Sequence, residues 1–176
     1  MTTNLKIETP VCVQWLIRKN MPSILEIENE SFEFPWLEAD FIHCLRHRNC
    51  AGMVADCEGQ IAGFMIYELH KSRIHLMSLA VRIEYRRQLV GSQLVAKLIE
   101  KLSYAHQNRI ILEVRESNLP AQLFFRECGF RAVSVLRAYY SDTPEDAYMM
   151  QYRYKPERIS IIPNEPEKER IIQYAD

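Results

Sequence analysis

A chain of 176 residues with 48% hydrophobic and 26% charged residues can bury the core of one globular domain, which excludes wholesale disorder. Its net charge of -1 excludes the basic field typical of nucleic-acid-binding proteins. Because residues 1–10 lack the apolar core of a signal peptide and no stretch of roughly 18 apolar residues occurs, we expect a cytoplasmic protein without a membrane partner.

The first part of the chain predicts one strand and two helices. Residues 11–17 are rich in β-branched and aromatic side chains, which favour a strand. Asn20 is a candidate helix cap with Pro22 in the first turn, and apolar residues follow at helical spacing. Residues 34–36, Phe-Pro-Trp, break this helix. A second helix follows, with an apolar face over residues 41–45.

A meander of three strands is predicted next. Residues 50–57, 60–69 and 73–81 form apolar or alternating runs of strand length. The dipeptide Glu58-Gly59 supplies the turn between the first two strands.

The remaining elements alternate between helices and strands. A helix begins near Gly91, because apolar residues recur there at helical spacing, and residues 109–114 form a short, buried strand. Residues 118–127 predict a short helix that is followed by Gly129. Residues 130–140 and 146–154 predict a closing pair of strands.

This order of elements predicts an α/β (α+β) fold in which a mixed sheet carries helices on its faces. We expect one domain over residues 1–156 and a charged C-terminal tail over residues 157–176. Residues 159–162, Ile-Ser-Ile-Ile, are a candidate edge strand or partner contact within that tail.

The cysteine and histidine spacings indicate neither a disulfide framework nor a metal site. The cysteines are Cys12, Cys44, Cys50, Cys57 and Cys128. Their number is odd and none form a Cys-x-x-Cys pair, so we expect thiols in a reducing compartment. The histidines are His43, His47, His70, His75 and His106. Because no set of them shows metal-ligand spacing, we expect no metal.

One segment between a predicted strand and a predicted helix is a candidate phosphate-binding loop. It comprises Arg86, Arg87, Gln88, Leu89, Val90, Gly91 and Ser92. The first N–H groups of a helix are unpaired and lie at its positive end, which suits a pyrophosphate, and Gly91 allows close approach. The alternative is an ordinary strand-to-helix turn with a solvated basic cluster.

This segment resembles motif A of the GNAT N-acetyltransferase superfamily, whose pattern is Q/R-x-x-G-x-G/A. Arg86 and Gly91 occupy the first and last positions, whereas Leu89 stands where the family usually has its first glycine. Further segments resemble the ribosomal-protein-alanine N-acetyltransferase branch, and together they span most of the chain from residue 17 to residue 154. These segments are Phe34-Pro35-Trp36, Leu79-Ala80-Val81, Leu112-Glu113-Val114-Arg115-Glu116-Ser117-Asn118, Cys128-Gly129-Phe130, Arg137-Ala138-Tyr139-Tyr140 and Asp146-Ala147-Tyr148-Met149-Met150.

The resemblance implies the GNAT fold, in which two parallel strands, here residues 73–81 and 109–114, splay apart around the acetyl thioester of acetyl-CoA. Leu79, Ala80 and Val81 then pair with the pantetheine arm of that co-substrate, and the loop of residues 86–92 binds its phosphates. Asn118 matches the family asparagine that hydrogen-bonds the co-substrate, a role compatible with capping the next helix.

The resemblance also assigns the chemistry. Glu113 stands at the position of the catalytic base, and its alternative is a strand glutamate paired with Arg115 or a lysine. Phe125 stands beside the co-substrate where the branch has a tyrosine that protonates the departing thiolate. Tyr139 or Tyr140 is a candidate replacement for that acid, and aromatic packing is the alternative for both.

Together these features predict an N-acetyltransferase that transfers acetyl from acetyl-CoA to the N-terminal α-amine of a protein or peptide. Acetylation of a small amine or a lysine is one alternative. A non-catalytic acyl-CoA-binding module is the other, because Leu89 and Phe125 depart from the family pattern.

Overall fold

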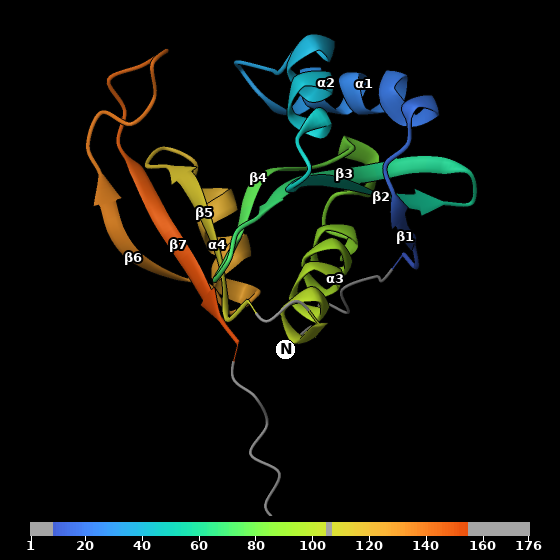
Figure 1. Cartoon of the computed structure of the whole chain (residues 1–176). Helices are drawn as coiled ribbons and strands as arrows, with labels where there is room; N and C mark the ends of the chain where they lie inside the picture. The colour runs from blue at the N-terminus through green and yellow to red at the C-terminus, as the bar shows by residue number, and fades with distance from the viewer. Residues whose placement is uncertain (1–8, 105–106, 155–176) are drawn as a thin grey trace, which may run out of the picture.

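The computed structural model describes residues 9–104 and 107–154, and it contains one sheet with helices on both faces (Figure 1). Its strands are β1 (Cys12–Trp15), β2 (Cys50–Cys57), β3 (Gln60–Leu69), β4 (Ile74–Val81), β5 (Arg109–Arg115), β6 (Arg131–Leu136) and β7 (Ala147–Arg153). Its helices are α1 (Met21–Ser31), α2 (Glu38–Arg46), α3 (Val90–Tyr104) and α4 (Leu119–Glu127), with 3-10 turns η1 (Arg18–Asn20) and η2 (Ile83–Tyr85). The predicted mixed α/β fold is therefore confirmed. His106 and the predicted tail over residues 157–176, with its candidate strand at 159–162, lie outside the described residues.

The sheet has two parts, which are joined only by a short pairing of its two parallel strands. The strand order is β1-β2-β3-β4-β5-β7-β6, and β4 with β5 is its parallel pair. The register of that pair covers Ile74↔Ile110 and His75↔Ile111. Beyond these residues the strands diverge, and Figure 1 shows β5, β6 and β7 turning away from β4. The divergence opens the gap between the C-terminal ends of β4 and β5 that the family resemblance predicts.

Each face of the sheet has its own hydrophobic core. On one face α3 buries Leu94 and Leu98, and α4 buries Phe125. Phe130, which follows α4, and inward-facing residues of the strands complete this cluster. On the other face α1 and α2 pack onto β3 and its neighbours in a separate cluster. Burial of these apolar surfaces is the main stabilising contribution to the fold. None of the helices in the described residues is long and apolar enough to cross a membrane.

The first strand is shorter than the predicted span of residues 11–17. It ends at Trp15, because the N–H of Ile17 donates to Oδ1 of Asn20 at 2.9 Å and the chain turns there. Asn20 therefore does not cap α1 through its side chain, as the sequence predicted, but closes the preceding turn. The predicted Pro22 in the first turn of α1 is confirmed.

The strand predicted over residues 130–140 also ends early, at Leu136. The carboxylate of Asp146 pairs with Arg137 and accepts the N–H of Ala138 at 2.9 Å. Ala138 has a φ of 45°, so the backbone leaves the extended conformation at that residue. The residues up to Glu145 consequently form a loop between β6 and β7 rather than a longer hairpin.

The expectation that the cysteines are all thiols was wrong for one pair. Cys44 and Cys50 form a disulfide between α2 and β2. The chain turns tightly between them, because His47 N–H donates to the carbonyl of Cys44 and Cys50 N–H donates to the carbonyl of His47, each at 3.0 Å. The two Cα atoms are therefore only 6.1 Å apart, which is within reach of a disulfide. Cys12 and Cys57 keep their thiols.

A buried carboxyl group fixes the loop between α1 and α2. Glu28 is only 2% exposed, and its Oε1 accepts the N–H of Trp36 at 2.9 Å. Its other oxygen, Oε2, is buried without a hydrogen-bond partner in the described part of the chain. Burial penalises the charged form and raises the pKa of Glu28 to about 7.

We predict that this carboxyl group makes stability depend on pH. Because its folded-state pKa is raised, the stability it contributes is present at pH 4.5 and below and is lost as pH rises through about 7. Glu28→Gln keeps the acceptor for Trp36 without the charge, so it should gain stability relative to wild type by roughly 1–3 kcal/mol between pH 5 and pH 8. Urea unfolding of both proteins at the two pH values measures the difference. Glu30→Gln, on the exposed side of α1, is the control, and a Glu28→Gln difference that is equal at both pH values would contradict the prediction.

Candidate active site

The candidate phosphate loop lies between the end of β4 and the start of α3. Arg87 and Leu89 have φ values of 64° and 61°, in the left-handed region. The loop thereby turns its backbone into α3, where Gln93 N–H donates to the carbonyl of Leu89 at 3.0 Å. The N–H groups of residues 90–92 precede this first helical bond and have no carbonyl within the helix to accept them. They are placed at the positive end of a long helix, as an anion site requires.

Arg86 ties this loop to the rest of the domain. Its Nε donates to the carbonyl of Val81 at 2.9 Å, and its guanidinium donates to the hydroxyl of Ser31 at 3.0 Å. The side chain therefore links the loop to the end of β4 and to the last residue of α1. A role of Arg86 in binding phosphate remains a prediction.

The N-terminal segment braces the same loop, which the sequence did not reveal. The N–H of Thr9 donates to the carbonyl of Gln88 at 3.1 Å. The side-chain amide of Gln93 donates to the carbonyl of Thr9 at 2.8 Å and accepts the N–H of Val11 at 3.2 Å. Residues 9–11 thus form a strap across the loop that holds its backbone in place.

Gly91 allows α3 and α4 to pack closely. A Cβ atom at this position would lie 3.1 Å from Cζ of Phe124 and 3.5 Å from a methyl group of Val81. The glycine predicted for close approach to a ligand therefore also serves contact between two helices. A groove of about 460 Å³ continues from Ser92 along α3 to Glu127 and Cys128 at the end of α4.

Glu113 lies on β5 at the point where the two parallel strands have separated. Its side chain is 12% exposed, and Oε2 lies 2.6 Å from Nε2 of His75 on β4. The contact follows from the register, because His75 pairs with Ile111 and Glu113 follows two residues later on the same face. The alternative pairing of Glu113 with Arg115 is not found. Sequence reasoning missed His75, and the signal available was its place on β4 opposite the segment before Glu113.

Arg115 instead organises the β6–β7 loop. Its guanidinium donates to Asp142 at 2.6 Å, to Glu145 at 3.0 Å and to the hydroxyl of Thr143 at 2.9 Å. It also lies 3.7 Å from the ring centroid of Tyr140. These contacts fix the loop that carries the two candidate tyrosines.

Tyr139 and Tyr140 lie close enough to Glu113 for its charge to act on both phenols. Their rings are perpendicular, with centroids 5.1 Å apart. Burial raises the pKa of Tyr139, and the negative charge of Glu113 raises it further. Burial likewise raises the pKa of Tyr140 to about 12, against a smaller lowering by Arg115. Both phenols are therefore protonated at neutral pH and can donate a hydrogen bond.

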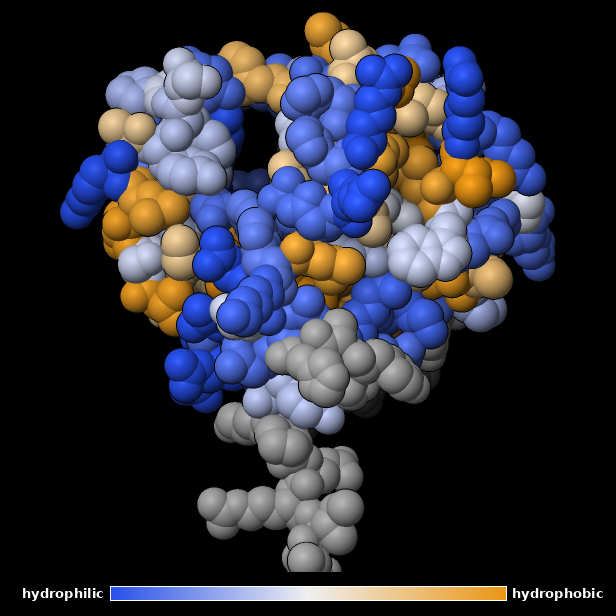
Figure 2. Space-filling model, viewed as in Figure 1, coloured by the Kyte–Doolittle hydropathy of each residue, from blue (hydrophilic) through white to orange (hydrophobic). Residues whose placement is uncertain are grey.

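The opposite wall is the loop between α1 and α2. Phe34 in this loop lies with its ring centroid 5.4 Å from the guanidinium of Arg115, at the end of β5, and the same guanidinium holds the β6–β7 loop. Figure 2 shows a hollow between the β6–β7 loop and the region of α1 and α2. The hollow lies above the splayed strands of Figure 1.

Two further predicted residues lie on α4. The side chain of Asn118 accepts the N–H of Ala121 at 3.1 Å, which confirms it as the cap of α4. Phe125 is 8% exposed and packs against Phe124 and Phe130, with ring centroids 5.0 and 5.4 Å apart. The part that either residue takes in binding a co-substrate remains a prediction.

The histidines are closer to one another than their spacing indicated. His70 and His75 lie with Glu68 at the end of the β3–β4 hairpin, and one possible ligand atom from each lies within 4.8 Å of the others. His43 on α2 and His47 just past its end contact each other through their rings.

Comparisons with known proteins agree with this geometry. A family described as "Acetyltransferase (GNAT) family" matches residues 21–130. The chain is 31% identical to the ribosomal protein bS18-alanine N-acetyltransferase of Escherichia coli (strain K12) over 133 residues, covering 74% of this chain and 89% of that protein. It is 31% identical to an N-alpha-acetyltransferase of Sulfurisphaera tokodaii over 123 residues, covering 62% of this chain and 73% of that protein. The crystal structure of the ribosomal-protein-S18-alanine N-acetyltransferase from Escherichia coli gives a TM-score of 0.74 at 27% identity, covering 85% of this chain and 99% of that chain.

We predict that the phosphate loop stores backbone strain at Leu89. A left-handed conformation costs a residue with a Cβ atom about 1–2 kcal/mol, whereas glycine adopts it freely. Leu89→Gly and Leu89→Ala both remove the leucine side chain, but only the glycine variant also removes the Cβ atom. The glycine variant should therefore be more stable than the alanine variant by about 1 kcal/mol, or about 2–4 °C in melting temperature. An alanine variant that melts at or above the glycine variant would contradict the strain.

Proposed function

Because the chain belongs to the acetyltransferase (GNAT) family, we propose that this N-acetyltransferase moves acetyl from acetyl-CoA to the N-terminal α-amine of a protein. The observation that carries the proposal is the placement of Glu113 beside the gap between β4 and β5, at the same end of the sheet as the phosphate loop. The names of its relatives in Escherichia coli and Sulfurisphaera tokodaii support a protein N-terminus as the acceptor.

Acetyl-CoA fits the features at the end of β4. The N–H groups at the start of α3 would hold the pyrophosphate, and the groove that begins at Ser92 would hold the neighbouring part of the co-substrate. Residues 79–81 lie beyond the last β4–β5 pair, so their backbone edge can pair with an extended pantetheine arm. Asn118 uses its side-chain oxygen for Ala121 and keeps its amide N–H groups for the co-substrate.

The acceptor amine would enter the hollow between the two loops. An N-terminal ammonium is cationic, and the proposal gives it the carboxylate of Glu113, on β5 beside the gap, as its partner. The tyrosine pair and Phe34 supply an aromatic wall on either side of the guanidinium of Arg115. A main-chain terminus suits this arrangement, because only its first residues need to enter between the two loops.

The proposed reaction uses Glu113 as the base. Glu113 takes a proton from the ammonium, directly or through water, and the free amine then attacks the thioester carbonyl carbon. The carbon–sulfur bond breaks, the acetyl group stays on nitrogen, the second amine proton leaves to solvent, and Glu113 then releases its own proton to solvent. Tyr139 donates a proton to the departing thiolate and recovers one from water. His75 holds the carboxylate of Glu113 in place through its contact at 2.6 Å.

The direct test is acetyl transfer to a panel of peptides with varied N-terminal residues, together with spermine and an aminoglycoside. The proposal expects acetylated α-amines on a subset of peptides, identified by mass spectrometry. Acetylation of lysine side chains or of the small amines alone would replace the proposed acceptor and leave the enzyme class intact.

We predict that Glu113→Gln removes the base while keeping the shape of the side chain. The turnover number should fall by about 10²-fold or more near neutral pH and recover at alkaline pH, where free amine accumulates. Glu30→Gln is the matched control on an exposed helix face and should leave the pH–rate profile unchanged. A Glu113→Gln enzyme with the wild-type profile would assign Glu113 a structural role.

We predict that Phe125→Tyr restores the acid that the family has at this position. The added hydroxyl acts mainly in the transition state, so turnover should rise with little change in KM, by at most about 10²–10⁴-fold. Phe125→Leu alters the same aromatic packing without a hydroxyl and should give no gain. If Phe125→Tyr also gives none and Tyr139→Phe is costly, Tyr139 is the acid. If wild type and variants bind acetyl-CoA but acetylate no amine, a binding module is the better description.

A further inference from the structure

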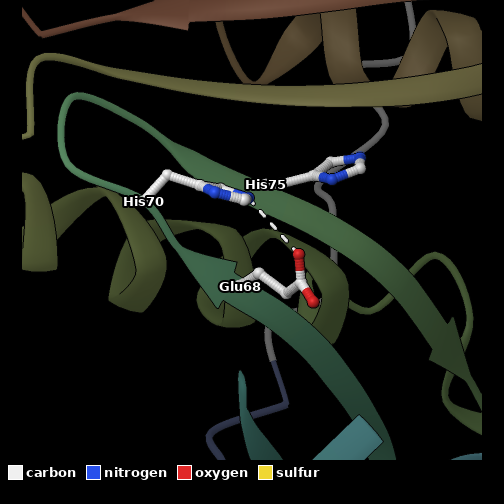
Figure 3. Close-up of side chains that lie close together, drawn as sticks. All are labelled: Glu68, His70 and His75. Atoms are coloured by element: carbon white, nitrogen blue, oxygen red, sulfur yellow. Dashed lines mark ion pairs between the residues drawn. The ribbon is translucent and has the colours of Figure 1, made fainter. Parts of the chain in front are cut away.

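Three side chains with metal-ligating atoms meet at one end of the β3–β4 hairpin. They are Glu68 at the end of β3, His70 just after it, and His75 at the start of β4 (Figure 3). One ligand atom from each lies within 4.8 Å of the other two. Oε2 of Glu68 and Nε2 of His70 are only 3.3 Å apart.

The backbone determines this arrangement. Glu68 and His75 are direct register partners across the two strands, and His70 follows Glu68 by two residues. The hairpin is closed by His70 N–H, which donates to the carbonyl of Arg73 at 2.9 Å. The buried side chain of Gln107 donates to the carbonyl of His70 at 3.0 Å, so the end of the hairpin is anchored to the segment before β5.

The imidazole of His70 has a nitrogen without a hydrogen bond. Its Nε2 is buried and makes no hydrogen bond within the described ranges 9–104 and 107–154, although the carboxylate of Glu68 lies close. A cation bound between the two residues would accept the lone pair of this buried nitrogen and stay paired with the carboxylate of Glu68.

His75 has the second contact that metal-binding histidines commonly make. Its Nε2 lies 2.6 Å from Glu113, which leaves Nδ1 as the nitrogen available to a ligand. Histidines that bind a metal through one nitrogen usually donate the other N–H to a carboxylate, which fixes the orientation of the ring. Glu113 is placed to be that carboxylate.

We propose that Glu68, His70 and His75 bind one divalent transition-metal ion, with zinc as the best match. Tetrahedral zinc with bonds of about 2.0–2.1 Å places its ligand atoms about 3.3 Å apart, the separation already present between Glu68 and His70. One possible ligand atom of His75 lies within 4.8 Å of those two. Two imidazoles and a carboxylate suit zinc, whereas magnesium and calcium prefer sites made of oxygen alone. The ion fixes the hairpin end and the ring of His75.

The site is tested with the full chain, freed of metal by a chelator and titrated with zinc chloride in a calorimeter. We expect one zinc ion per chain, a raised melting temperature through ligand linkage, and no such effect from magnesium chloride. His70→Ala and the nearly isosteric Glu68→Gln should each weaken zinc binding at least tenfold. His43→Ala is the matched control, because it removes a histidine on α2 from the other histidine pair.

Three results would overturn the proposal. The first is the absence of a stoichiometric zinc ion in a protein whose circular dichroism shows that it is folded. The second is zinc binding that survives both His70→Ala and Glu68→Gln, or that His43→Ala abolishes. The third is zinc binding that disappears when the cysteine thiols are alkylated, because the thiols would then be the ligands. None of these measurements depends on acetyl transfer, so the proposed function and this site can fail separately.

Discussion

The architecture of the site depends on how soon the pairing of β4 with β5 ends. A parallel pair normally continues for the length of the shorter strand, but here it stops after two residue pairs. The free edge of β4 and the edge of β5 then both border the gap. Separate hydrophobic clusters on the two faces keep both parts of the sheet stable although the ladder between them is short.

Polar contacts fix the two loops on either side of the gap. Arg115 gathers Asp142, Glu145 and Tyr140 from the β6–β7 loop, while Glu28 holds the N–H of Trp36 in the α1–α2 loop. The two arrangements differ in the free energy needed to bury their charges. Arg115 stays partly solvated and has carboxylate partners, whereas Glu28 is buried and one of its oxygens has no hydrogen bond. The α1–α2 loop is therefore maintained by a residue that is itself unfavourable to bury in its charged form.

The sequence predicted the order of the elements well, because hydrophobic periodicity reports which face each residue buries. The strands over residues 50–57 and 60–69 have their predicted bounds, while β1 and β6 end early where Asn20 and Asp146 accept backbone N–H groups. Such local hydrogen bonds of side chains to the backbone leave little trace in periodicity.

For the site, the sequence indicated single residues but not the contacts between residues that are far apart in the chain. Motif resemblance pointed to Glu113, the candidate phosphate loop and Asn118. Glu113 lies beside β4 and Asn118 caps α4, while their parts in catalysis and binding stay predictions. It could not find His75 or the Cys44–Cys50 disulfide, because these contacts depend on strand register and on a tight turn. It also could not show that Arg86 is engaged with Val81 and Ser31, since spacing along the chain carries no information about a partner 55 residues away.

The strap of residues 9–11 has a thermodynamic consequence. It contacts the candidate phosphate loop through the backbone of Gln88 and the side chain of Gln93, and we propose that the same loop binds the pyrophosphate of the co-substrate. When the strap and the co-substrate both bind the same loop, their binding free energies are coupled, and this coupling is reciprocal. If the strap favours the loop conformation that holds phosphate, then occupancy of the loop must tighten the strap by the same free energy. The binding of the strap to the loop and the binding of the co-substrate to the loop are then linked by one coupling free energy, so a change that weakens one weakens the other.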